Sequence, residues 1–182
     1  MSTTPQPALA VAAIETPRLR LEPLLERHAR ELFAGLRAPE LYAYMDEAPP
    51  TSEAALAERY RFLEARSSPD GSELWLNWAL FARESRDYVG TVQATVRAGG
   101  DAEIAYVLLP PAQGHGFASE AVAAMLAELR NSFGARAFIA HVDPRNHASI
   151  ALLDRLGFTR TGTRAASSPA QPEPDLVFRR EA

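Results

Sequence analysis

The chain has 182 residues, of which 47% are hydrophobic and 23% are charged, and its formal net charge is -4 at pH 7. These proportions are those of a globular protein, and the length suits one domain better than two. The acidic balance provides no global positive field for nucleic acid or for an acidic membrane surface. The chain has no cysteine, which excludes a disulfide, a thiolate zinc site and a cysteine nucleophile.

The N-terminal segment predicts a flexible tail over residues 1–14, followed by a single domain over residues 15–182. A short apolar patch, Ala8 to Ile14, lies beside prolines and has no basic segment before it, which argues against a signal peptide. No run approaches the roughly 18 apolar residues that span a bilayer. We therefore expect a cytoplasmic protein with neither a membrane nor a nucleic acid as partner.

The next part of the chain predicts one strand and two helices. Residues 18–24 alternate polar and apolar side chains, as in a strand, and residues 25–36 repeat apolar side chains at helical spacing. Thr51 or Ser52 is a suitable N-cap for a second helix, from Glu53 to Arg66. The sequence SSPDG then ends this helix.

The middle of the chain predicts an antiparallel meander. Residues 73–83, 88–98 and 102–109 are rich in Val, Trp, Tyr and Ile, and short turn signals separate them. Short turns of this kind join antiparallel strands. Trp75 and Trp78 should face opposite sides of the first of these strands.

The last part predicts a crossover from strand to helix to strand. A helix runs to Phe133 and stops at Gly134, residues 136–142 form a strand, and Asn146 caps a further helix that ends at Gly157. Residues 175–180 should form a strand at an edge of the sheet. The strands joined by the crossover must be parallel, and ligands of α/β sheets bind at the carboxyl ends of such strands.

The segment PPAQGHGFASEA, residues 110–121, lies at that position. Its small residues leave backbone NH groups free at a helix N-terminus, where the helix dipole favours a diphosphate. A nucleotide P-loop needs lysine and then Ser or Thr after the second glycine, whereas Phe117 and Ala118 stand there. A dinucleotide-binding loop needs a third glycine, whose place is taken by Ser119 or Glu120.

A third kind of loop fits better. QGHGFA, residues 113–118, matches the pattern Q/R-x-x-G-x-G/A and resembles the acetyl-CoA diphosphate loop of the GNAT superfamily of N-acetyltransferases. EIAYVLLPPAQGHGFASEA, residues 103–121, is similar to the RimJ/RimL-like branch of that superfamily. NHASIALLDRLGF, residues 146–158, resembles the motif that follows in the family. The resemblance covers roughly residues 15–165 and includes the order of the elements.

This resemblance implies an α/β (α+β) acyl-CoA N-acyltransferase fold. Its mixed sheet is mostly antiparallel, contains one parallel pair of splayed strands and is flanked by helices. It implies transfer of an acetyl group from acetyl-CoA, without a metal, to the amine of a small molecule or a protein N-terminus by direct attack in a ternary complex. A non-catalytic acyl-CoA-binding module or sensor is the alternative. Either a monomer or a homodimer is compatible with the sequence.

The resemblance also implies which residues contact acetyl-CoA. Backbone NH groups over residues 113–118 hold the diphosphate, and Ser119 adds a hydroxyl. Leu108 and Leu109, at a bulge ending their strand, contact the pantetheine, and Asn146 approaches from the next helix. Many relatives carry Arg or Lys where this chain has His115. The complete set is Leu108, Leu109, Gln113, Gly114, His115, Gly116, Phe117, Ala118, Ser119 and Asn146.

Two residues are candidates for the chemistry. An amine with a pKa of about 10 must lose a proton before it attacks, and we expect Glu103 to be the general base, with an ordinary solvated carboxylate as the equal alternative. The family motif assigns Ser149 to protonate the leaving thiolate, although a purely structural role in the capped first turn is the alternative. The NH of Leu108 or Leu109 could stabilise the oxyanion.

The acceptor site is expected near the segment between the two early helices. Tyr42, Tyr44, Asp46 and Glu47 could receive a cationic amine there, and an ordinary surface connection is as compatible with the sequence. The histidines, among them His115, show no metal-ligand spacing.

Overall fold

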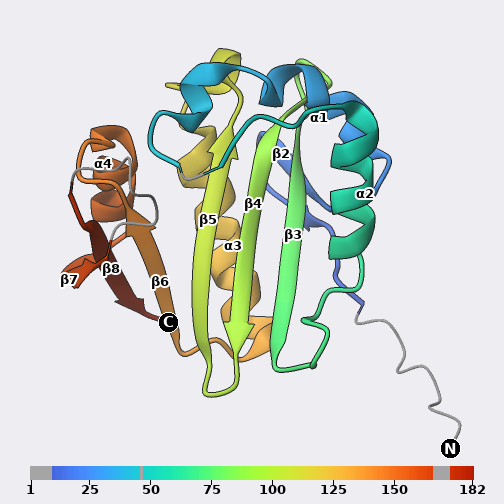
Figure 1. Cartoon of the computed structure of the whole chain (residues 1–182). Helices are drawn as coiled ribbons and strands as arrows, with labels where there is room; N and C mark the ends of the chain where they lie inside the picture. The colour runs from blue at the N-terminus through green and yellow to red at the C-terminus, as the bar shows by residue number, and fades with distance from the viewer. Residues whose placement is uncertain (1–9, 46, 166–172) are drawn as a thin grey trace, which may run out of the picture.

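The computed structural model describes residues 10–45, 47–165 and 173–182. In these residues one mixed sheet of eight strands forms the centre of the molecule (Figure 1). Its strands, from one edge to the other, are β1 (Ile14–Glu15), β2 (Leu19–Pro23), β3 (Glu73–Ala82), β4 (Asp87–Arg97), β5 (Asp101–Leu108), β6 (Ala137–Val142), β8 (Asp175–Glu181) and β7 (Thr159–Arg164). The helices are α1 (His28–Leu36), α2 (Glu53–Leu63), α3 (Phe117–Phe133) and α4 (His147–Arg155), with short 3-10 helices η1 (Pro39–Tyr42) and η2 (Pro110–Ala112).

The sheet divides between β5 and β6. All other neighbouring strands are antiparallel, whereas β5 and β6 are parallel and pair only from Asp101 with Ala137 to Glu103 with Ile139. Beyond this point β5 continues to Leu108, and the two strands diverge toward the top of Figure 1. The mixed sheet with a parallel, splayed pair is therefore confirmed.

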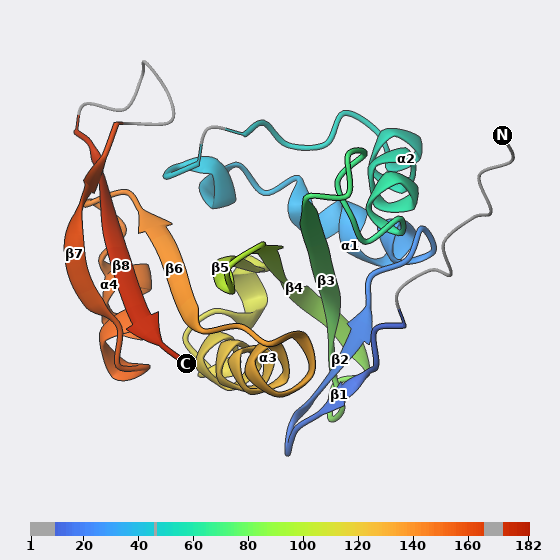
Figure 2. The ribbon, with the colours of Figure 1, turned by 90° about the horizontal axis from the view of Figure 1, so that it is seen from below.

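Helices cover both faces of the sheet, as the view from below shows (Figure 2). On one face α3 buries Met125 and Leu129 in the main core, against Trp78 of β3. On the other face α1 and α2 form a smaller core, in which Leu32 packs with Ala79 of β3. Burial of these side chains provides most of the driving force for folding. The described helices include none with the length and apolar character needed to cross a bilayer.

Two helices begin at the capping residues expected from the sequence. The Ser52 hydroxyl accepts a hydrogen bond of 3.0 Å from the NH of Ala55 at the start of α2. The Asn146 side chain accepts one of 3.1 Å from the NH of Ser149 at the start of α4. Helix α3 ends before Gly134, which has the left-handed φ of 66°. These local signals predict the starts of α2 and α4 and the end of α3, because each satisfies end groups that lack helical partners. The other boundaries differ: α1 begins at His28 and not at residue 25, and α2 ends at Leu63 and not at Arg66.

The C-terminal strands differ from expectation. The sequence DLVFRR does form a strand, β8, but this strand lies between β6 and β7 and not at an edge. Leu176 and Phe178 are buried in the main core, which explains the interior position. The edge strand is β7, TRTGTR, whose residues are all exposed and lack the apolar alternation by which strands are predicted.

The described end of the N-terminal segment also packs on the sheet. Ile14 pairs with Leu21 across β1 and β2, and the Trp78 indole NH donates a hydrogen bond of 3.1 Å to the carbonyl oxygen of Ala12. Residues 1–9 of the expected tail lie outside the described residues. Trp78 is fully buried, whereas Trp75, on the opposite side of β3, packs against Phe62 of α2 with 5.6 Å between ring centroids.

The N-cap of α2 provides a test of this local structure. Ser52→Ala removes the acceptor for the Ala55 NH and should lower the free energy of unfolding by about 1 kcal/mol. Thr51→Ala is the matched control, because the Thr51 side chain makes no hydrogen bond among the described residues. Urea unfolding followed by circular dichroism measures both; equal losses for the two variants would contradict the assignment of Ser52 as the cap.

Candidate functional site

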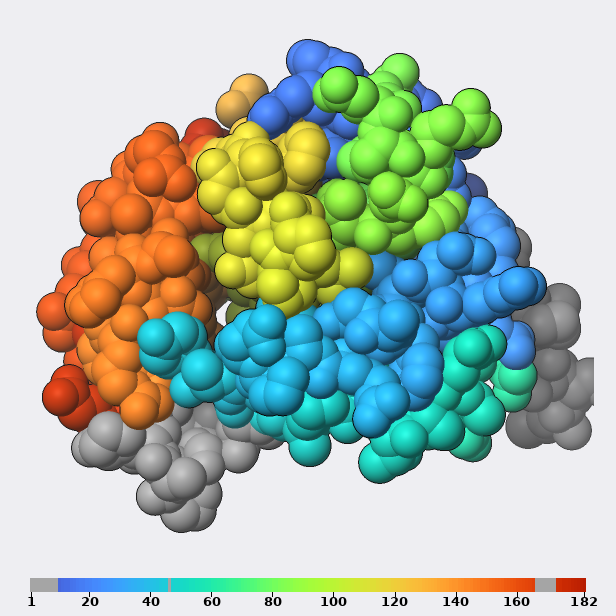
Figure 3. All heavy atoms as spheres, turned by 90° about the horizontal axis from the view of Figure 1, so that it is seen from above, coloured from blue at the N-terminus to red at the C-terminus, as the bar shows by residue number. Residues whose placement is uncertain are grey.

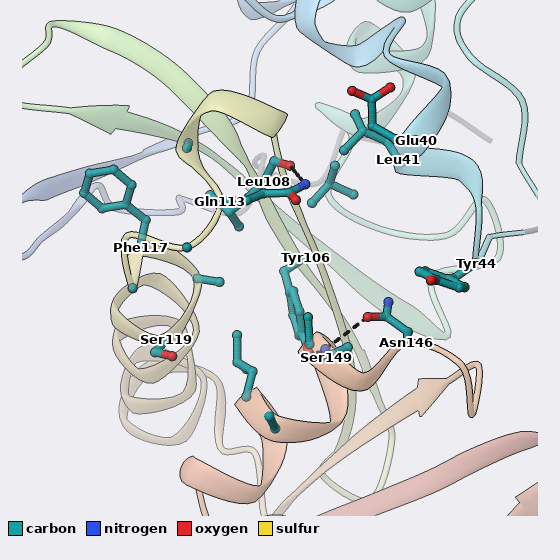
Figure 4. A pocket seen from close by; sticks show the side chains of 18 of the residues that line it. Glu40, Leu41, Tyr44, Tyr106, Leu108, Gln113, Phe117, Ser119, Asn146 and Ser149 are labelled. Carbon is teal, nitrogen blue, oxygen red and sulfur yellow. Dashed lines mark hydrogen bonds between the residues drawn. The ribbon is translucent and has the colours of Figure 1, made fainter.

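A cavity of about 710 Å³ opens at the carboxyl end of β5. The space-filling view from above shows a hollow between the segment after β5, drawn yellow, the α4 region, drawn orange, and the segment around η1, drawn blue to cyan (Figure 3). Figure 4 shows side chains that line the cavity. Residues of the lining are Glu40, Leu41, Tyr44, Met45, Tyr106, Val107, Leu108, Ala112, Gln113, Gly114, Gly116, Phe117, Ala118, Ser119, Asn146, Ala148, Ser149, Ala151, Leu152 and Arg155.

The glycine segment presents free backbone NH groups at the start of α3. Gly114 and Gly116 have left-handed φ angles of 80° and 79°, which side chains other than glycine rarely adopt. Gly116 is the N-cap residue of α3. Among the described residues, the amides from Gly114 to Ser119 have no hydrogen-bond acceptor. A helix N-terminus with this many free donors is suited to an anion.

Leu108 and Leu109 occupy different environments. The NH of Leu109 donates a hydrogen bond of 2.9 Å to the carbonyl oxygen of Val89, and the Leu109 side chain is buried in the smaller core. Successive backbone groups of a strand point to opposite sides, so the NH of Leu108 points away from β4, toward the gap beside β6. The Leu108 carbonyl accepts a hydrogen bond of 2.9 Å from Gln113 Nε2. Of the two leucines, the structure brings only Leu108 into the cavity lining.

The expected bulge at the end of β5 lies in β4 instead. The register between β3 and β4 shifts at Val89, between the pairs Leu80 with Gly90 and Phe81 with Tyr88, whereas the pairing of β4 with β5 is continuous. Gly90 has a φ of 155°, and a Cβ there would clash with the Val107 carbonyl oxygen. This close approach requires glycine at the position next to the irregularity.

Ser149 and Asn146 line the cavity from the first turn of α4, and Tyr106 of β5 joins them. The hydroxyls of Tyr106 and Ser149 are 2.6 Å apart. Burial raises the pKa of Tyr106, and the hydrogen bond to Ser149 offsets only part of this rise. Tyr106 was not predicted from the sequence. Its place in the period-2 pattern of β5, on the same face as Leu108, is the signal that could have identified it.

Glu103 lies outside the cavity lining, at the last position of β5 that pairs with β6. Its carboxylate accepts hydrogen bonds from Arg97 Nη1 at 3.1 Å and His141 Nδ1 at 2.9 Å, and Arg164 Nη1 is 3.7 Å away. Partial burial acts to raise the pKa of Glu103, but the hydrogen bonds and charges of Arg97 and His141 outweigh it and hold the pKa below its ordinary value. A carboxylate held ionised in this way is a weak base at neutral pH.

His115 is also outside this lining. It lies on a second cavity, of about 1030 Å³, on the other side of the glycine segment. The described residues include no group of three or more His, Asp or Glu side chains that could hold a metal ion.

The segment between α1 and α2 contributes a wall of the main cavity, but with a partly different set of residues from that expected. Tyr44 lines the cavity, whereas the Tyr42 hydroxyl donates a hydrogen bond of 2.7 Å to the Leu36 carbonyl. Glu47 pairs with Arg59 at 3.4 Å. Asp46 lies outside the described residues. Glu40, which the sequence analysis missed, is the single carboxylate among the described lining residues.

Comparisons with known proteins identify similar families and folds. The family model described as "Acetyltransferase (GNAT) domain" matches residues 18–159. The protein "Uncharacterized N-acetyltransferase YoaA" of Bacillus subtilis (strain 168) is 27% identical over 152 residues, which are 82% of this chain and 84% of that protein.

Solved structures share the fold. A probable acetyltransferase (GNAT family) from Chromobacterium violaceum ATCC 12472 is 26% identical with a TM-score of 0.77, and the match covers 100% of this chain and 95% of that one. RimL, a ribosomal L7/L12 alpha-N-protein acetyltransferase in complex with coenzyme A, has a TM-score of 0.81 at 20% identity, over 93% of this chain and 98% of that one.

The ion pairs of Glu103 predict a pH-dependent contribution to stability. Because the pKa of Glu103 is lower in the folded than in the unfolded chain, its stabilising effect is present above about pH 4.5 and is lost as the pH falls below that value. Glu103→Gln should therefore lower the free energy of unfolding at pH 7, with a difference from wild type that shrinks toward pH 3. Urea unfolding across this range measures it; a difference independent of pH would contradict the prediction.

Proposed function

The chain belongs to the GNAT acetyltransferase family, and we propose that it transfers an acetyl group from acetyl-CoA to a primary amine by direct attack in a ternary complex. The observation that carries this proposal is the row of free amides from Gly114 to Ser119, at the mouth of a cavity that extends to the split between β5 and β6. These donors suit a diphosphate. The other end of the cavity carries the hydroxyls of Tyr106 and Ser149.

The residues that would hold acetyl-CoA are divided between three elements. The amides from Gly114 to Ser119 and the Ser119 hydroxyl would bind the diphosphate. The backbone of Tyr106, which faces the gap beside β6, would bind the pantetheine amides as a neighbouring strand would, and the Leu108 side chain would contact the pantetheine. Asn146 uses its Oδ1 for the cap of α4, which leaves its NH2 group to donate. Acetyl-CoA supplies the reactive thioester.

Ser149 would donate a proton to the leaving thiolate. Its own NH is already bonded to Asn146, and its hydroxyl oxygen lies 2.6 Å from that of Tyr106. With its raised pKa, Tyr106 stays protonated at neutral pH and can donate to Ser149 Oγ. The Ser149 proton is then directed into the cavity. The NH of Leu108 would stabilise the oxyanion, since that of Leu109 is bonded to Val89.

The acceptor is a primary amine, of a small molecule or of a protein N-terminus. Support for the second class comes from the fold shared with RimL, and for a cationic acceptor from Glu40, whose carboxylate forms neither a hydrogen bond nor an ion pair with the described residues. We assign Glu40 to attract the protonated amine, which loses one proton to solvent water before it attacks the thioester. A protein of the cytoplasm, acting as a monomer or homodimer, fits this chemistry.

The release of free thiol from acetyl-CoA, measured against a panel of amines and peptides with free N-termini, tests the activity. Ser149→Ala should lower kcat by about 10²-fold and leave the Kd for CoA unchanged, and Ser67→Ala is a control on the surface.

Tyr106→Phe should lower kcat too, and adding it to Ser149→Ala should lower kcat little further, because both hydroxyls act through one hydrogen bond. Tyr60→Phe, in α2, is the matched control. Wild-type binding of CoA without thiol release for any amine would favour the non-catalytic acyl-CoA-binding module.

The same assay distinguishes the roles of the Glu40 and Glu103 carboxylates. Glu40→Gln should raise KM for the amine several-fold and leave KM for acetyl-CoA unchanged, since about 1 kcal/mol is typical of one partly exposed charge contact. Glu47→Gln is the control, because Glu47 is paired with Arg59.

Glu103→Gln should change kcat by less than about threefold, as expected for a carboxylate in structural ion pairs. A loss of kcat of about 10²-fold with a flattened pH profile would instead establish Glu103 as the general base.

A further inference from the structure

Arg18, immediately before β2, makes several contacts with the glycine segment and the first turn of α3. Its Nη1 donates a hydrogen bond of 2.8 Å to the carbonyl oxygen of His115, and its Nε donates one of 2.6 Å to Glu120 Oε2. Its guanidinium carbon lies 4.8 Å from the centroid of the Phe117 ring. The Arg18 carbonyl accepts a hydrogen bond of 3.0 Å from the Arg83 NH, so the side chain extends from backbone that is held by the sheet.

The contact with His115 determines which way a peptide group faces. In a trans peptide the C=O of one residue and the NH of the next point in opposite directions. Arg18 holds the His115 carbonyl toward the second cavity, which Arg18 and His115 both line. The NH of Gly116 therefore points the other way, toward the cavity proposed for acetyl-CoA. Because Gly114 and Gly116 tolerate many conformations, this peptide group would otherwise be free to turn over.

The contact with Glu120 removes a competitor for the anion. Glu120 lies in the first turn of α3, next to the free amides. One of its carboxylate oxygens accepts hydrogen bonds from the Thr16 hydroxyl at 2.6 Å and the Arg18 NH at 2.9 Å, and the other accepts from Arg18 Nε. Partial burial acts to raise the pKa of Glu120, but these hydrogen bonds and the charge of Arg18 outweigh it and lower the pKa. The ionised carboxylate is thus directed at Thr16 and Arg18, and its charge is compensated.

We propose that Arg18 is a positioning residue for the diphosphate-binding segment: it fixes the peptide between His115 and Gly116 with the NH facing the ligand, and it neutralises Glu120 beside that ligand. This role rests on the proposed function. Many relatives carry a positive charge within the loop, where this chain has His115. Here the positive charge beside the segment comes from Arg18, about a hundred positions earlier in the chain. Arg18 acts through the main chain and needs no contact with the ligand.

Three ligands distinguish this role from its alternatives: CoA, dephospho-CoA, which keeps the diphosphate but lacks the 3′-phosphate, and pantetheine, which lacks both. Arg18→Ala should raise the Kd for CoA and for dephospho-CoA by the same factor, about tenfold for the loss of charged hydrogen bonds. The Kd for pantetheine should stay unchanged. Isothermal titration calorimetry measures the three values, and circular dichroism verifies the fold of each variant.

Arg20→Ala is the matched control. Arg20 lies two residues further along, its side chain is 50% exposed like that of Arg18, and it pairs with Glu15 and Glu22 away from the glycine segment. All three Kd values should equal those of wild type. Arg18→Lys, which keeps the charge but not the planar fork, should bind CoA with an affinity between those of wild type and Arg18→Ala.

The proposal is overturned by any of the following binding results. Weaker binding of all three ligands would show general damage to the fold, and weaker binding of CoA alone would show a direct contact with the 3′-phosphate. Arg18→Lys with wild-type affinity would show that the paired contacts are not needed. If wild type itself binds neither CoA nor dephospho-CoA, the proposed function fails, whereas a wild-type Kd in Arg18→Ala overturns only the role of Arg18.

Discussion

The separation of β5 from β6 is the constraint on which the site depends. After the pair of Glu103 with Ile139, one side of the β5 backbone has no neighbouring strand in the described structure. Backbone groups inside a protein need partners, so the NH and C=O groups of Tyr106 and the NH of Leu108 on that side favour a ligand that pairs as a strand does, whereas the Leu108 C=O is bonded to Gln113. The same separation makes room for α4, which brings Ser149 to Tyr106. An intact sheet at this place would have neither cavity nor hydroxyl pair.

The parts of the fold that local chemistry determines could be predicted from the sequence. Ser52, Asn146 and Gly134 mark helix ends because each satisfies or terminates backbone groups a few residues away. The free amides around Gly116 follow from the same kind of reasoning, since two glycines and a helix start are adjacent in the chain. The parallel pairing of β5 with β6 could also be predicted, because a connection that contains a whole helix joins parallel strands.

Features that depend on distant partners could not be predicted in this way. Whether β8 lies at an edge depends on β7, and the TRTGTR sequence of β7 has no apolar pattern. The environment of Glu103 depends on Arg97, His141 and Arg164, which come from three different strands. Arg18 and Glu120 are polar residues in ordinary positions, and only the fold brings them together. The hydrophobic pattern of a strand indicates which face a side chain occupies, but not which charged residue lies opposite it.

Binding and chemistry are placed on different elements of this molecule. The diphosphate donors belong to the start of α3 and are held by Arg18 from the N-terminal end of β2. Tyr106 and Ser149 belong to β5 and α4 (Figure 4). Arg18 and its partners share no hydrogen bond with the hydroxyl pair among the described residues. Substitutions at sites without shared partners have nearly additive effects. Affinity for the diphosphate and the rate of the chemical step are therefore separable in this chain, because a change on one side leaves the hydrogen bonds of the other intact.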